Sequence, residues 1–438
     1  MFFESSSSES AISSEPAAEQ QPLLQDGQNR RTVGDGLSGP GLRPKPAEHI
    51  ALKVVAVMYS WFTTGMHVAS VGALLPLIET YYDIKDAAAA VIFLVAVSGY
   101  LVGTSLVHTA HVNFGWRGVS ILAGIFHVAG GVVLWSQPSY AIILAAYLLV
   151  GVGTGFCDSS FCTWAASVRE ADKISGLIHG SYALGCVTGP IIVAALEKAA
   201  LGWRSFYLVT LVAFAVEAGA ILIAFRHENA AKHWASTCPK ESSDIGFAGS
   251  WKPIFMCSLY CFVYVGIEAS LSGWLTSYMI RNRHMSPSIA ALATSLFWVG
   301  MVLGRFSLGP LARLAGLRLT VIVFVCTSVG LQVLFRLQAS LALSLCLAAG
   351  IGFVAGPIFP SGILTMTKRL PKSIHVRAVA LTCAIGQLGG AGAPFVIGVV
   401  AQTSGIERLF DVVLGLSLTL LLVWLWFSRP LAIDCVDE

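Results

Sequence analysis

Long apolar runs alternate with short polar breaks along the chain from Leu52 to Phe427. A helix needs about 20 mostly apolar residues to cross the hydrocarbon core of a bilayer. Twelve runs have this character, and we expect one membrane-spanning helix in each of 52–75, 88–108, 118–136, 140–164, 174–197, 204–225, 252–279, 287–309, 317–335, 339–366, 376–402 and 406–427. A polar stretch from Arg226 to Trp251 separates the sixth run from the seventh, so the pattern predicts two groups of six spans.

The composition agrees with a polytopic membrane protein. Apolar residues make up 55% of the 438 positions and charged residues only 12%, whereas soluble domains carry about 25% charged residues. This excludes a soluble enzyme, and the net charge of +3 does not indicate nucleic-acid binding. No GxxxxGK[ST] loop, HExxH motif or Ser-His-Asp arrangement occurs, so we expect neither ATP-driven pumping nor catalysis, and no metal or cofactor.

The pattern divides the chain into five parts. We expect a disordered tail at 1–50, a six-helix bundle at 51–225, a linker at 226–251, a second six-helix bundle at 252–427 and a short tail at 428–438. The first tail is rich in Ser, Glu, Gln and Pro, and such a segment cannot bury enough apolar surface to fold. It contains Glu19, Leu23 and Leu24 in an arrangement that resembles an acidic dileucine sorting signal, which predicts a cytosolic adaptor as a partner.

The Lys and Arg residues predict the orientation, because cytosolic loops of membrane proteins are enriched in them. If the N-terminus is cytosolic, 20 of the 27 basic residues fall on the cytosolic side and 7 on the other. We therefore expect both tails and the linker in the cytosol. The membrane is either the plasma membrane or a vacuolar or endosomal one.

The second half repeats the first at an offset of 201 residues. Gly99, Gly103, Gly115 and Arg117 fall on Gly300, Gly304, Gly316 and Arg318, and Gly65 and Gly72 fall on Gly266 and Gly273. The same offset pairs His67 with Glu268. Parallel repeats of this kind predict two halves related by an axis along the membrane normal, with a substrate site between them.

These features resemble the major facilitator superfamily over about residues 50–430. The residues similar to its conformational loop motif are Gly103, Arg117, Gly304, Arg305, Gly309 and Arg318. Within the superfamily, four stretches are similar to the fucose:proton symporter branch and its fungal relatives: Gly151–Asp158, His179–Gly185, Gly266–Glu268 and Gly356–Pro360. The resemblance implies an all-α fold of twelve helices in a six-plus-six arrangement, acting as a monomer by alternating access, with helices one, four, seven and ten around the cavity.

Three acids lie deep inside the predicted spans: Asp158, Glu217 and Glu268. An acid at membrane depth normally faces a cavity or a partner and indicates a functional site. Asp158 shares a helix face with glycines, and we predict that it carries the coupling proton. Glu268, with His67 as a candidate partner across the pseudo-twofold, is predicted to bind substrate or a second proton. Glu217 lies among Ala and Phe, and we interpret it as structural.

Further polar and aromatic groups are candidates for substrate contact. Trp274 and Tyr278 lie one turn apart beyond Glu268 and can stack on a planar solute, although aromatic residues near a helix end also anchor spans at the interface. Gln387 lies in the Gly-rich run 386–392, which we expect to interrupt a stiff helix. Cys162 follows Asp158 by one turn, at a position where relatives of the symporter branch often carry Asn.

The sequence therefore predicts a secondary active transporter of a small polar or amphipathic organic solute, coupled to protons. Two alternatives remain. One is an efflux pump for a hydrophobic secondary metabolite or drug, which would explain a thiol at Cys162. The other is a membrane sensor or scaffold that has kept the fold and moves no solute.

Overall fold

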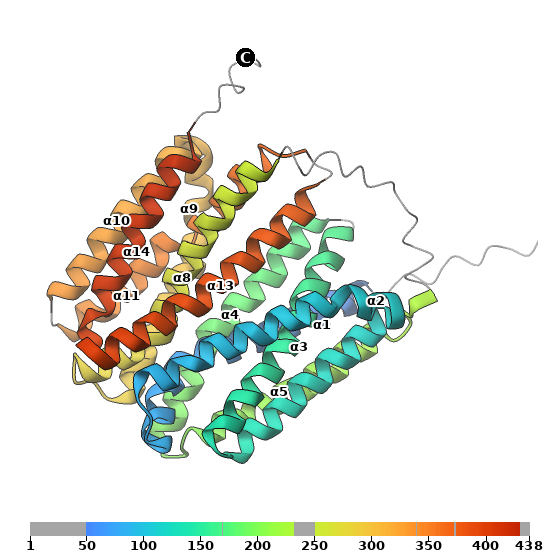
Figure 1. Cartoon of the computed structure of the whole chain (residues 1–438), viewed down its shortest axis with the longest axis horizontal. Helices are drawn as coiled ribbons and strands as arrows, with labels where there is room; N and C mark the ends of the chain where they lie inside the picture. Colours follow the sequence, from blue (N-terminus) through green and yellow to red (C-terminus); the bar gives the residue numbers. More distant parts are fainter. Residues whose placement is uncertain (1–49, 169, 232–249, 339, 372–373, 430–438) are drawn as a thin grey trace, which may run out of the picture. The chain divides into compact units, whose positions relative to one another are not determined.

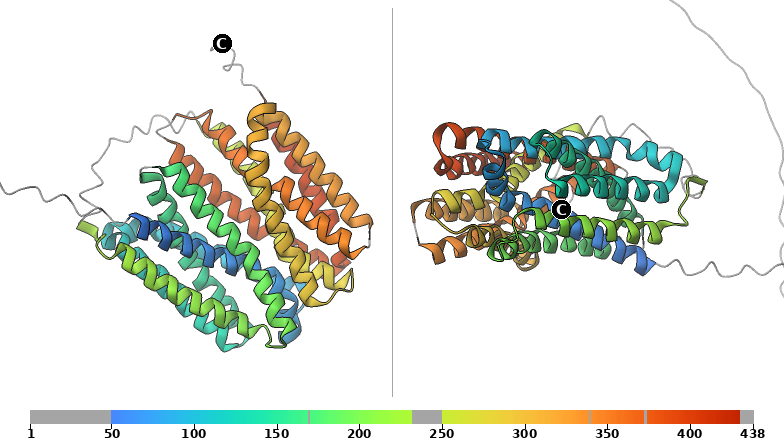
Figure 2. Two further views of the ribbon diagram at one scale, coloured as in Figure 1. Left: turned by 180° about the vertical axis from the view of Figure 1, so that it is seen from behind. Right: turned by 90° about the horizontal axis from the view of Figure 1, so that it is seen from below.

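A computed structural model describes residues 50–168, 170–231, 250–338, 340–371 and 374–429, all within one compact unit, His49–Glu438. Helices α1 to α5 form the first half (Figures 1 and 2): α1 (Ile50–Tyr82), α2 (Asp86–Ser136), α3 (Tyr140–Ser167), α4 (Ala171–Lys198) and α5 (Arg204–Phe225). The second half comprises α8 (Trp251–Arg281), α9 (Pro287–Ala315), α10 (Leu317–Leu337), α11 (Leu341–Ala355), α12 (Ile358–Thr367), α13 (His375–Ser404), the short η2 (Ile406–Arg408) and α14 (Leu409–Phe427).

The prediction of twelve spans in an all-α membrane fold is confirmed. Within the described ranges, eleven helical segments are long and apolar enough to cross a membrane, and one of them, α2, covers two of the predicted runs. With 51 residues, α2 would be about 77 Å long if straight. That is more than twice the hydrocarbon thickness.

The reversal inside α2 occurs at Gly115, whose backbone has φ 67° and ψ −170°. This left-handed conformation is unfavourable for residues that carry a Cβ. A Cβ at Gly115 would also collide with the backbone of Asn229. The neighbouring Arg117 N–H donates to the Glu228 carbonyl at 2.9 Å, so the chain that leaves α5 packs against this turn.

The internal repeat is visible as a set of matched backbone contacts. In the first half, Gly99, Gly103, Gly151 and Gly155 touch the carbonyls of Leu148, Val152, Ala96 and Tyr100, between α2 and α3. In the second half, Gly300, Gly304, Gly352 and Gly356 touch the carbonyls of Ala349, Phe353, Phe297 and Met301, between α9 and α11. Every partner is displaced by 201 residues. The glycines therefore serve close helix packing in the same register in both halves.

One expectation about local structure was wrong. The Gly-rich run 386–392 does not interrupt its helix, because α13 continues from His375 to Ser404 with Pro394 inside it. Its glycines instead allow close approach to α8: a Cβ at Gly389 would collide with the Phe262 carbonyl. A glycine in a helix interior costs about 1 kcal/mol relative to alanine in water, and close backbone packing in the membrane offsets that cost.

The outer surface of the helices is apolar. Phe306, Val212 and Leu422 are more than half exposed. Large exposed apolar side chains on this scale are unusual in a soluble monomer and typical of a surface in contact with lipid.

Candidate functional site

Asp158 lies on α3, in a polar contact with α2. The Tyr100 hydroxyl donates to Asp158 Oδ2 at 2.6 Å, and the following residue, Ser159, donates to Thr104 on α2 at 3.0 Å. Gly155 lets the α2 backbone approach at Tyr100, which brings its hydroxyl within reach of the carboxylate. Asp158 is only partly buried, and it interacts electrostatically with Cys383 of α13, in the other half.

Glu268 lies on α8 and has a basic partner on α9. Arg305 Nη2 is 3.9 Å from Glu268 Oε2, and the two side chains are 27% and 18% exposed. Tyr264, one turn before Glu268 on α8, interacts with both groups. A partly exposed acid and base inside two long membrane spans are the kind of polar groups that face a water-filled or ligand-filled space.

Tyr182 of α4 lies within electrostatic range of both Asp158 and Glu268. Its ring packs edge-on against Trp298 of α9, with the ring centroids 6.4 Å apart. The predicted residues Asp158 and Glu268 therefore come from opposite halves of the protein. We call Tyr100, Asp158, Tyr182, Glu268, Arg305 and Cys383 the central polar set.

His67 does not belong to the central polar set. Its side chain is buried in the first half, with ring centroids 5.6 Å from Tyr147 and 5.7 Å from Phe214. Its Nδ1 has no hydrogen-bond partner. The ionic partner of Glu268 is Arg305, so the suggested pairing of Glu268 with His67 was wrong. Equivalent positions in the repeat do not meet here, because α1 turns this face toward α3 and α5.

Glu217 of α5 is fully buried and has the richest set of hydrogen bonds of the three intramembrane acids. Ser60 donates to its Oε1 at 2.5 Å, and His127 Nδ1 lies 3.0 Å from its Oε2. Thr63 lies 3.2 Å from Oε2, and the Cys157 thiol lies 3.7 Å from Oε1. These partners come from α1, α2 and α3. The cluster therefore joins four helices of the first half, as the structural interpretation of Glu217 requires.

His127, Cys157 and Glu217 also have ligand atoms within 4.8 Å of one another and could hold a metal ion by donor type. The carboxylate already accepts from hydroxyl, imidazole and thiol donors, so hydrogen bonding alone explains the cluster. The sequence offered only one signal for it, the acid inside an apolar span. Its partners lie between 60 and 157 residues away in the chain.

The remaining substrate candidates occupy different environments. Trp274 is fully buried and donates from Nε1 to the Pro394 carbonyl at 2.9 Å. Tyr278 packs against Phe335 and Phe410. Both aromatics therefore join α8 to other helices of the second half. The sequence also named Gln387, which is half-buried on α13, and Cys162, which is exposed near Asp158.

The residues of the predicted conformational loop motif lie within helices as well as at turns. Gly115 and Gly316, with φ 67° and 81°, lie at the two turns, each followed two residues later by Arg117 or Arg318. Gly103, Gly304 and Gly309 lie within helices α2 and α9. Arg305 also lies inside α9, ten residues before its end, where it meets Glu268 instead of a loop partner.

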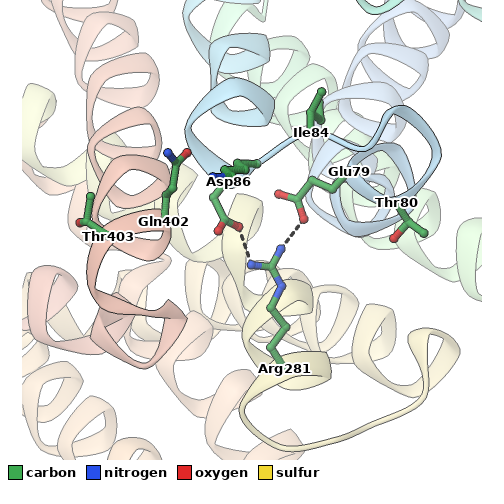
Figure 3. Close-up of a pocket in the computed structure, with 8 residues that line it drawn as sticks. Glu79, Thr80, Ile84, Asp86, Arg281, Gln402 and Thr403 are labelled. Atoms are coloured by element: carbon green, nitrogen blue, oxygen red, sulfur yellow. Dashed lines mark hydrogen bonds and ion pairs between the residues drawn. The ribbon is translucent and has the colours of Figure 1, made fainter.

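A second polar group closes one end of the interface between the halves (Figure 3). Arg281, the last residue of α8, donates from Nη1 to Asp86 Oδ1 at 2.5 Å and from Nη2 to Glu79 Oε2. Nearby, the Ala87 N–H donates to Gln402 Oε1 of α13 at 3.1 Å. We call the end that holds these residues the Glu79 end.

The Glu79 end also contains a polar pocket of about 510 Å³, lined by Glu79, Thr80, Ile84, Lys85, Asp86, Arg281, Gln402 and Thr403. Its walls come from both halves. Deeper in the interface, a Cβ at Gly72 of α1 would collide with the Ser272 carbonyl of α8. The backbones of the two halves are thus in direct contact, deeper in the interface than the ion pairs of Arg281.

Glu19, Leu23 and Leu24 of the predicted sorting motif lie outside the described residues, as does 232–249 of the predicted linker. The boundaries of the five predicted parts and the roles of the site residues stay predictions.

The chain is similar to several curated membrane proteins, some of which are named as transporters. It is 28% identical over 397 residues to Bypass of stop codon protein 6 of Saccharomyces cerevisiae, covering 82% of this chain and 78% of that protein. It is 25% identical to an uncharacterised MFS-type transporter of Yersinia pestis (83% of this chain, 93% of that one) and 25% identical to the glucose/mannose transporter GlcP of Bacillus subtilis (77% and 85%). No family model matches the sequence.

Among solved structures, the fold matches a bacterial homologue of the human lysosomal transporter Spinster. The TM-score is 0.68 for its inward-facing, unoccupied form, at 13% identity over 88% of this chain and 98% of that one. The occupied form gives a TM-score of 0.64. The chain is therefore a multi-pass membrane protein that is similar in sequence to transporters of the major facilitator superfamily and similar in fold to the Spinster homologue.

Proposed function

We propose that the protein is a secondary active transporter that moves a small polar or amphipathic organic solute by alternating access, coupled to protons. The observation that carries this proposal is the position of Asp158 and Glu268. The two partly exposed carboxylates lie in opposite halves, and Tyr182 of α4 lies within electrostatic range of both. A solute bound between them would touch both halves, as alternating access requires.

Asp158 has the features of a proton carrier. Among the residues that the structure describes, its one hydrogen bond is the short one from Tyr100, and no basic group pairs with it. A partly exposed intramembrane carboxylate without a cationic partner can take up and release a proton, as the acids of proton relays do. Glu268, by contrast, has Arg305 close by, and this pair can receive a solute that offers hydroxyl or amine groups.

The Glu79 end supports alternating access. Arg281 of the second half binds two acids of the first, so opening this end would require both ion pairs to break. We propose that this end faces away from the cytosol, in accord with the charge bias of the loops, and that both termini are cytosolic. The protein then acts as a monomer in the plasma membrane or a vacuolar or endosomal membrane, with the N-terminal dileucine motif read by an adaptor.

The solute class follows from the chemistry of the central polar set. Two carboxylates, a guanidinium and two phenols bind hydroxyl-rich solutes well, and one relative is named as a glucose/mannose transporter. Hexoses are therefore the first solutes to test. The exposed Cys162 beside Cys383 makes part of this surface less polar, which favours the alternative of an amphipathic or hydrophobic exported metabolite.

Purified protein in liposomes with an imposed pH gradient tests the proposal. Asp158→Asn should abolish accumulation driven by the gradient but preserve exchange of labelled for unlabelled solute, since Asn mimics the protonated acid. Glu268→Gln should weaken solute binding and raise the half-saturating concentration. Normal accumulation by Asp158→Asn would refute the proton assignment. Failure to move any solute, including hexoses and the metabolites that differ between deletion and overexpression cells, would favour a sensor or scaffold.

A further inference from the structure

The tenth predicted span is broken, and the break leaves a backbone carbonyl inside the protein without its helical hydrogen-bond donor. Helix α11 ends at Ala355 and α12 begins at Ile358, with Gly356 and Pro357 between them. In a continuous helix the carbonyl of residue i accepts from the N–H of residue i+4. Pro360 has no N–H, so the Gly356 carbonyl has no helical donor. A buried carbonyl without a donor is costly and requires a partner from elsewhere.

The corresponding part of the first half has no such break. At the offset of 201 residues, Pro357 and Pro360 correspond to Phe156 and Ser159, and α3 runs through both positions without interruption. The break is therefore specific to the second half, although the glycine contacts on either side of it are shared.

Side chains from two neighbouring helices donate to three carbonyls around the break, and one of these is the Gly356 carbonyl that lacks a helical donor. The Tyr264 hydroxyl donates to the Ala355 carbonyl at 3.0 Å, and the Tyr260 hydroxyl donates to the Ile358 carbonyl at 2.9 Å. Arg305 Nε of α9 donates to the Gly356 carbonyl at 3.3 Å. Tyr260 and Tyr264 are four residues apart and almost fully buried, so they lie on the face of α8 that meets the break.

Glu268 is the next residue on that face of α8, four positions after Tyr264. The Arg305 guanidinium therefore lies between the break and Glu268: its Nε binds the Gly356 carbonyl, and its Nη2 is 3.9 Å from Glu268 Oε2. Nη2 also contacts Met301 Sδ at 3.4 Å within α9. The helices are closely packed beside Arg305, because a Cβ at Gly356 would collide with the Met301 carbonyl.

We propose that Arg305 is a positioning residue that links the state of Glu268 to the break between α11 and α12. While Glu268 is ionised, its charge holds the guanidinium where Nε supports the Gly356 carbonyl. When Glu268 takes up a proton or binds a solute, Arg305 loses its counterion and the carbonyl loses its fixed donor. Helix α12 is then free to move relative to α11.

Titratable groups of α4 and α8 surround the Glu268–Arg305 pair. Tyr264 of α8 lies within electrostatic range of both groups, as do Tyr182 and Cys186 of α4 for Glu268 and His179 of α4 for Arg305. Glu268 is the one carboxylate of this group, so it supplies the counterion for Arg305. The inference rests on the proposed function only in identifying Glu268 as the residue that binds solute or proton.

Hydrogen exchange of purified full-length protein, measured by mass spectrometry on peptides from α12, tests the link without any solute. Glu268→Gln, which mimics the protonated acid, should speed exchange in α12 about tenfold, which corresponds to about 1.4 kcal/mol. Arg305→Gln should have the same effect, and the double variant should exceed neither single variant. Peptides from α14 serve as the internal reference.

Tyr260→Phe is the matched control, because it removes the donor to the Ile358 carbonyl at the break but keeps Tyr264, Glu268 and Arg305. When this change is combined with Glu268→Gln, the two increases in the α12 exchange rate should multiply, since the two changes act on different carbonyls. If Arg305→Gln fails to fold, Arg305→Lys replaces it: lysine keeps the charge but has no Nε donor, so α12 should exchange faster even with Glu268 ionised.

The wild-type protein should also show a pH-dependent step in α12 exchange, after correction for intrinsic rates, and Glu268→Gln should lack that step. Exchange in Glu268→Gln within twofold of wild type would overturn the proposal. The proposal would also be overturned if the effects of Glu268→Gln and Arg305→Gln on α12 exchange multiplied in the double variant. Since no transport is measured, failure of the proposed function would appear only in the liposome assay.

Discussion

Replacement of Arg281 by alanine should open the Glu79 end. Arg281 makes two charge-assisted hydrogen bonds across the interface, to Glu79 and Asp86, whose side chains are 8% and 12% exposed. Arg281 itself is 35% exposed, so solvent weakens both contacts. A hydrogen bond to a charged group contributes about 1.5–3 kcal/mol when well shielded and an exposed ion pair about 1 kcal/mol at most.

Loss of both contacts should therefore cost the closed state about 2–3 kcal/mol. Since 1.36 kcal/mol is a factor of ten, the ratio of open to closed molecules should rise about 30-fold to 150-fold. The range holds as long as the closed state remains the major one, because the response saturates once most molecules are open.

Cysteine labelling measures this ratio. Phe93 of α2 packs against Gly273 of α8, between the halves and below the ion pairs. Phe93→Cys, in a background with Cys162, Cys326 and Cys346, together with Cys238 and Cys435 outside the described residues, changed to Ser, should react slowly with a membrane-impermeant maleimide. Adding Arg281→Ala should increase the reaction rate by the stated factor.

Arg283→Ala is the matched control. Arg283 lies two residues after Arg281 but donates to the Phe335 carbonyl at 2.7 Å, within the second half. Its loss removes the same charge from the same end without touching the first half, so labelling should stay near the parent rate. Equal rates in the Arg281→Ala and Arg283→Ala proteins would show that the ion pairs do not hold this end closed.

Three further predictions concern topology, sorting and stability. A reporter cysteine at Ser139 should label from outside the cell and one at Ser243 should not; the reverse result would invert the orientation. Changing Leu23 and Leu24 to Ala should move the protein to the cell surface, whereas unchanged localisation by microscopy would remove the adaptor from the proposal. Glu217→Gln should lower the melting temperature of the purified protein, because the amide of Gln cannot accept from all four donors and each unsatisfied group costs about 1–3 kcal/mol. An unchanged melting temperature would contradict a structural role.

The order and number of the membrane spans could be predicted from the sequence because they depend on local properties. A run of about 20 apolar residues is long enough to cross the bilayer wherever its neighbours lie. The repeat was also readable, since glycines at an offset of 201 mark the same close contacts in both halves. The depth of Asp158 and Glu268 followed from their positions in apolar runs.

What these residues contact was decided only by the tertiary structure. A partner across the bundle depends on how each helix is rotated and tilted, which its own sequence leaves open. Repeat symmetry made His67 and Glu268 equivalent but did not make them neighbours, because α1 presents His67 to Tyr147 and Phe214. In the same way, Arg305 belongs by sequence to a loop motif. The break at Gly356 and the position of α8 give it a carbonyl and a carboxylate to bind inside the membrane.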